Sequence, residues 1–116
     1  MKHLAIFAAL LAPVAAAAEI FPADWPAVTA QAQGQTVYWN AWGGSTTTNE
    51  FIAWVGKRVS EDYGVTLEHV KLTDTADAVT RVLSEKQAGE DADGAIDLIW
   101  INGSNFDAMK EADLLF

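Results

Sequence analysis

The sequence predicts an α/β fold in which a small parallel sheet is flanked by helices. Three short runs have the apolar or alternating pattern of strands, and each is followed by a stretch with apolar residues at helical spacing. The expected strands are residues 36–40, 65–71 and 97–101, and the expected helices are residues 24–33, 47–63, 75–87 and a segment after 102. Because strands and helices alternate, we expect right-handed crossovers and parallel strands.

Helix boundaries are indicated by capping residues. Asp24 can cap the first helix, with Pro26 in its first turn. We expect a threonine to cap the second helix and Gly64 to end it. The turn that contains Thr73 and Asp74 precedes the third helix in the same way.

The strand patterns also predict the order of strands in the sheet. Residues 65–71 alternate between apolar and polar, as expected of an edge strand with one solvated face. Residues 36–40 and 97–101 are apolar runs, and we expect 97–101 to be central. The predicted order is therefore second, first, third (2-1-3). In such a sheet the connections leave the first and third strands in opposite directions, and ligands bind beyond their carboxyl ends.

Two loops follow those carboxyl ends, residues 41–46 and 102–105. Trp42 is expected in a polar turn where it joins no apolar stripe, which favours stacking on a ligand. Trp39, Trp54 and Trp100 are expected to pack inside the fold. Each loop has a structural interpretation as well, because Gly-Gly and Asn-Gly are ordinary turn sequences.

Asp74 is most simply a helix cap, although its loop can also reach the ligand-binding region beyond the carboxyl ends of the first and third strands.

Residues 1–18 have the pattern of a secretory signal peptide. A basic start is followed by an apolar stretch and by four consecutive alanines. A membrane anchor is the alternative, but the apolar stretch is short and contains Pro13, whereas a spanning helix needs about 20 apolar residues. We therefore expect a signal peptide over residues 1–18, with cleavage before Glu19, and a single domain over residues 19–116.

Composition and charge limit the possible partners. The 116 residues carry a net charge of −9, which argues against nucleic acid and anionic membranes. The chain has no cysteine, and His69 has no evident catalytic partner. Asp91, Asp93 and Asp97 lack the full spacing of a calcium loop. We therefore expect a monomeric binding protein without catalytic residues, metal or cofactor, whose partner is a small-molecule solute.

Four stretches resemble a known family: the export segment, VYWNAWGGST (37–46), KLTDTAD (71–77) and DLIWINGSNFDAMKEADLLF (97–116). They are similar to the start of an ABC-transporter solute-binding protein, in a subgroup of family 1 extracellular solute-binding proteins whose ligand is poorly defined. The resemblance implies a periplasmic receptor of type II periplasmic binding protein fold, with two lobes that close on a solute and deliver it to a permease and its ATPase.

Carried over by position, the resemblance implies three ligand-binding loops. Their residues are Trp42, Gly43, Gly44, Ser45, Thr46, Thr73, Asp74, Asn102, Gly103, Ser104 and Asn105. Members of that family are several times longer, so the resemblance implies an incomplete N-terminal lobe. Two alternatives come from other classes: a complete small flavodoxin-like α/β binding domain and, less favoured, an exported hydrolase.

Export can be tested directly. N-terminal sequencing of the chain recovered from the periplasm should begin at or near Glu19, because the alanine-rich segment before it suits signal peptidase. A chain that retains Met1 and stays in the cytosol would contradict the signal-peptide interpretation.

Overall fold

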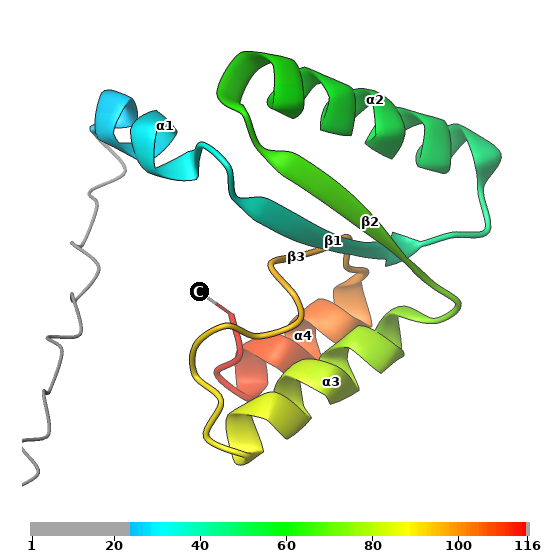
Figure 1. Cartoon of the computed structure of the whole chain (residues 1–116). Coiled ribbons are helices and arrows are strands. Elements are labelled where there is room, and N and C mark those ends of the chain that lie inside the picture. Colours follow the sequence, from blue (N-terminus) through cyan, green and yellow to red (C-terminus); the bar gives the residue numbers. More distant parts are fainter. Residues whose placement is uncertain (1–23, 116) are drawn as a thin grey trace, which may run out of the picture.

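The computed structural model describes residues 24–115 and has an α/β fold (Figure 1). Its sheet contains three parallel strands, β1 (Thr36–Trp42), β2 (Thr66–Leu72) and β3 (Leu98–Ile99), in the order β2-β1-β3. The predicted α/β class and the predicted order 2-1-3 are therefore confirmed. The predicted signal segment, residues 1–18, lies outside the described residues.

The helices lie on both sides of this sheet. They are α1 (Trp25–Ala32), α2 (Thr46–Tyr63), α3 (Thr75–Gln87) and α4 (Gly103–Glu111). Figure 1 shows α2 on one side of the sheet, with α3 and α4 together on the other. None of the helices within residues 24–115 is long and apolar enough to cross a membrane.

Most helix ends follow the predicted chemistry. Asp24, Asp74 and Asn102 each accept a hydrogen bond at the start of a helix, and Gly64 ends α2 with a φ of 67°. The predicted threonine cap of α2 is wrong. Ser45 has the extended backbone of a cap, and its Oγ accepts a hydrogen bond from the Thr48 amide at 3.2 Å.

The first strand is longer than predicted, and this changes the interpretation of Trp42. β1 continues to Trp42 because Ala41 and Trp42 pair with Lys71 and Leu72 of β2. The Gly43 amide then donates a hydrogen bond to the Leu72 carbonyl at 2.9 Å. Trp42 is thus the last residue of a paired strand, and its expected position in a polar turn is wrong.

The third strand is shorter than predicted and does not lie at the centre. Within residues 24–115 the central strand is β1, and β3 forms an edge with only two residues. The Tyr38 amide donates a hydrogen bond at 2.7 Å to the Asp97 carboxylate, where a regular parallel strand would offer a carbonyl. This side-chain contact explains why regular pairing begins only at Leu98.

The fully buried core of the described residues is small. Its apolar members are Ala41, Ile52, Ala78 and Met109, of which only Ile52 is large. Ile52 lies on α2, Ala78 on α3 and Met109 on α4, so each principal helix places a side chain against the sheet or its neighbour. The larger aromatic residues remain partly exposed, including Trp54, which was expected to pack inside the fold.

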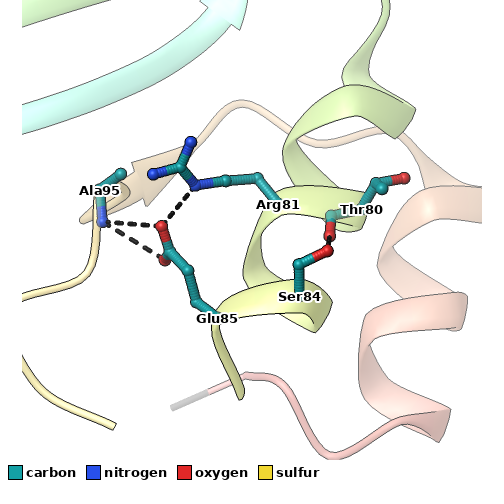
Figure 2. A network of polar contacts seen from close by, with 5 residues as sticks. All are labelled: Thr80, Arg81, Ser84, Glu85 and Ala95. Carbon is teal, nitrogen blue, oxygen red and sulfur yellow. Dashed lines mark hydrogen bonds and ion pairs between the residues drawn. The ribbon is translucent and has the colours of Figure 1, made fainter. Parts of the chain in front are cut away.

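A polar network fixes the loop that leads into β3 (Figure 2). The Glu85 carboxylate accepts a hydrogen bond from Arg81 Nε at 2.5 Å and weaker ones from the Ala95 amide at 3.3 and 3.4 Å. The bond from Arg81 is the main reason that the pKa of Glu85 is lowered, and the Ala95 amide lowers it further. The same pair raises the pKa of Arg81.

This network predicts a pH-dependent contribution to stability. Because the folded-state pKa of Glu85 lies below its ordinary value of 4.5, the contribution should be fully present above pH 4.5 and lost as the pH falls through the folded pKa. Glu85→Gln should therefore lower the melting temperature at pH 7, and its difference from wild type should shrink below pH 4.5.

Glu61→Gln is the matched control. Glu61 pairs with Lys57 at 3.8 Å within a single exposed turn of α2, so its loss should change the melting temperature little. Equal effects of both substitutions at pH 7 would contradict a special role for Glu85.

Candidate functional site

A pocket of about 450 Å³ lies beyond the carboxyl ends of β1 and β3, where α2, α3 and α4 begin. Its lining comes from the end of β1, the first turn of α2, the start of α3 and the segment between β3 and α4. The lining residues are Ala41, Trp42, Thr48, Thr73, Asp74, Thr75, Trp100, Ile101 and Asn102.

Four of the predicted site residues line this pocket: Trp42, Thr73, Asp74 and Asn102. The other predicted residues are not among those that line it: Gly43, Gly44, Ser45, Thr46, Gly103, Ser104 and Asn105. Ser45 is the cap of α2, and the amide and side chain of Asn105 both donate to Asn102 Oδ1. Ser45 and Asn105 thus contribute to helix caps rather than to the pocket lining.

Four lining residues lie outside the loops predicted to bind a ligand: Thr48, Thr75, Trp100 and Ile101. Ala41 lies in the predicted loop 41–46, although it was not selected as a ligand-binding residue. Trp100 and Ile101 were expected in a buried strand. Thr48 and Thr75 were expected in the first turns of two helices. A signal for the threonines was available, because the first turn of any helix that follows a strand in this sheet points toward the same edge.

The indole of Trp42 is held at the end of β1 and is 52% exposed. Its ring lies against Gly44, since a Cβ built on Gly44 would overlap Cζ2 of that ring. Gly43 is also tightly placed, because a Cβ there would lie 2.8 Å from the Lys71 Cβ. The two glycines thus allow the chain to pass close to Trp42 on one side and to β2 on the other.

Trp100 is a second aromatic wall of the pocket. Its ring stacks on Trp39, with centroids 5.8 Å apart and an interplanar angle of 14°, and meets the Phe51 ring edge-on at 6.3 Å. These contacts fix the indole while 48% of Trp100 stays exposed. The expectation that Trp100 is a core residue is therefore wrong, because β3 ends before it and leaves its ring at the rim of the sheet.

The polar groups of the pocket are mostly hydroxyl and amide groups. Asp74 is the charged residue of the lining, and its Oδ1 accepts the Ala76 amide at 2.9 Å. Asn102 Oδ1 accepts the Asn105 amide at 3.3 Å. Thr75 lines the pocket and is only 8% exposed. Within residues 24–115 the buried side-chain atom without a hydrogen-bond partner is Asn49 Oδ1, and Asn49 does not line the pocket.

The pocket is exposed to both positive charge, from helix amino ends, and negative charge, from a carboxylate. The amino ends of α2, α3 and α4 each place partial positive charge nearby, which favours an anion by roughly 0.3–1 kcal/mol per helix. Each end is already capped by its own side chain, and the cap of α3 carries a full negative charge. The described residues contain no cluster of three or more histidine or acidic side chains that could hold a metal ion.

A second cavity, of about 460 Å³, has a different character. It lies between α1, α2 and the sheet, and its lining residues are apolar or aromatic apart from Thr29. Trp25 and Tyr63 meet edge-on at its rim, with centroids 5.8 Å apart. Because this cavity offers few polar groups to orient a ligand, the pocket at the strand ends is the better candidate site.

Comparison with known proteins gives one named relative. The chain is 46% identical over 92 residues to Protein YnjB of Escherichia coli (strain K12), and the match covers 79% of the chain and 24% of that protein. No family model matches the chain, and no solved structure matches it. The chain thus spans about a quarter of the length of this relative.

These findings correct the family assignment made from sequence stretches. The assignment to family 1 of the extracellular solute-binding proteins is wrong on this comparison, because no model of that family matches. The name Protein YnjB states neither a ligand nor a transport role.

The contact between Trp42 and Gly44 leads to a prediction. In Gly44→Ala the new methyl group must displace the indole, so the indole N–H signal of Trp42 in a ¹H–¹⁵N spectrum should shift. The fold should persist, because the obstructing atoms belong to the movable end of a side chain.

Gly103→Ala is the control, since a Cβ at Gly103 meets nothing within 4 Å. It should leave the Trp42 signal in place and change the free energy of unfolding by about 1 kcal/mol or less. An unchanged Trp42 signal in Gly44→Ala would contradict the described packing.

Proposed function

We propose that this chain is the first α/β lobe of an exported solute-binding protein with a type II periplasmic binding protein fold. In this proposal the pocket beyond β1 and β3 is one wall of the binding site, and a second lobe supplies the opposite wall. The loaded protein delivers its small solute to the permease and ATPase of a membrane transporter. The chain binds its solute and does not transform it.

The observation that carries the proposal is the joining of two distant segments in one pocket. Trp42 is the last residue of β1 and Asn102 follows β3, and both line the same cavity at the edge where neighbouring parallel strands end. This edge is the usual ligand position in sheets of this type. The pocket combines two aromatic surfaces with a few polar groups, which suits a small polar solute.

The residues favour binding over catalysis. His69, the histidine of the described range, is not among the pocket residues, and its Nε2 lies 3.4 Å from the Ala41 carbonyl. Asp74 is engaged in capping α3. The pocket therefore lacks the paired base and nucleophile that an acyl-transfer or hydrolytic mechanism needs.

A solute screen tests the proposal. Thermal-shift measurements against a library of small polar solutes should identify compounds that stabilise the chain, and the hits should then be titrated calorimetrically against variants. Trp42→Ala should weaken binding by about 1–3 kcal/mol because it removes a stacking surface. Asn102→Ser should cost about 1 kcal/mol per lost amide hydrogen bond, while serine can still cap α4.

Trp54→Ala is the matched control, because Trp54 is a similarly exposed tryptophan (59%) on α2 that does not line the pocket. Its affinity for the same hits should equal that of the wild type. Hits that bind the Trp42 and Asn102 variants as tightly as the wild type would exclude this pocket as the binding site.

A further inference from the structure

We propose that the solute bound by this pocket is a small organic cation whose ammonium group lies between the Asp74 carboxylate and the indole faces of Trp42 and Trp100. This inference rests on the proposed function and specifies its ligand class. Two independent features of the pocket support it: two exposed aromatic faces, and a lining whose charged side chain is a carboxylate.

The aromatic faces are the first feature. Trp42 and Trp100 expose about half of their surface, at 52% and 48%, and both line the pocket. Trp42 lies against Gly44, and Trp100 is held by stacking on Trp39. The face of an indole is the aromatic surface that attracts cations most strongly.

The charge of the lining is the second feature. Asp74 is its charged member, and no lysine or arginine lines the pocket. Capping α3 engages Asp74 Oδ1, and the negative charge on the second oxygen of this carboxylate can still attract a cationic ammonium group. The net charge of −9 also raises the local concentration of cations near the protein.

An anion is the main competing ligand, because three helices begin at the pocket. The helix caps make binding of an anion less favourable. The side chains of Ser45, Asp74 and Asn102 already accept hydrogen bonds from the first-turn amides that would otherwise bind an anion. A full negative charge at the start of α3 also opposes a second one nearby.

Three probes of matched size separate the ligand classes. Choline carries a quaternary ammonium group, 3,3-dimethylbutan-1-ol is its neutral isostere, and inorganic phosphate is an anion. Each is titrated into the ¹⁵N-labelled full chain while the indole N–H signals are followed. Choline should shift the signals of Trp42 and Trp100 saturably and leave those of Trp25 and Trp54 in place, and the neutral isostere should bind about fivefold or more weakly.

Asp74→Asn isolates the charge, because asparagine caps a helix as well as aspartate does. In this variant choline should bind about fivefold more weakly, while the neutral isostere and the melting temperature stay unchanged. Asp74→Ala, which also removes the cap, should lower the melting temperature and so distinguishes the two roles of Asp74.

Each other outcome overturns the proposal. Equal binding of choline and its isostere, or an Asp74→Asn variant that binds choline like the wild type, rejects the cation. If phosphate or the isostere alone shifts Trp42 and Trp100, the ligand class is wrong and the pocket remains a solute site. If no probe shifts these signals, the cation is rejected, and the solute screen described above decides the proposed function separately.

Discussion

The pairing of β1 on both of its edges is the constraint on which the rest of this structure depends. β1 pairs with β2 along all seven of its residues and with β3 through Trp39 and Asn40. Because all three strands are parallel, their carboxyl ends lie at one edge of the sheet, and the helices that follow begin there. A one-residue slip of β1 would move Ala41 from the core and turn Trp42 to the opposite face.

The pocket is a consequence of this arrangement. A parallel sheet requires each chain segment to leave its strand, form a helix and return, so every strand end is followed by a helix start. The side chains that cap those helices therefore gather at one edge, together with the last side chains of the strands. Asp74 and Asn102 each serve twice, since they hold a helix start and also line the pocket.

The sequence was sufficient to predict the elements and their order, because periodicity and capping chemistry are local properties. It predicted α3 with its cap and its end, and it predicted the order 2-1-3 from the contrast between an alternating strand and two apolar runs. The predicted strand bounds were wrong where pairing with residues distant in the sequence determines them. Trp42 joined the sheet because Leu72 pairs with it, and residues 97–101 formed a short edge strand in which Leu98 and Ile99 alone pair with β1.

In the candidate site too, residues set by local sequence could be predicted, and residues set by distant contacts could not. Trp42 and Asn102 could be selected from the sequence, because glycine, asparagine and an isolated tryptophan mark strand ends. Trp100 could not, because its access to the pocket depends on where β3 ends. The family assignment failed for a different reason: it rested on short stretches, and no family model matches the chain.

The capping residues around the pocket have an evolutionary consequence. Serine, threonine, asparagine and aspartate stabilise a helix start to a similar extent, so one can replace another at Ser45, Asp74 or Asn102 with little loss of folding free energy. Each exchange nevertheless alters the charge or the hydrogen-bonding pattern that the pocket presents. A lineage can therefore change what this edge recognises by single substitutions, while the sheet that supports it remains the same.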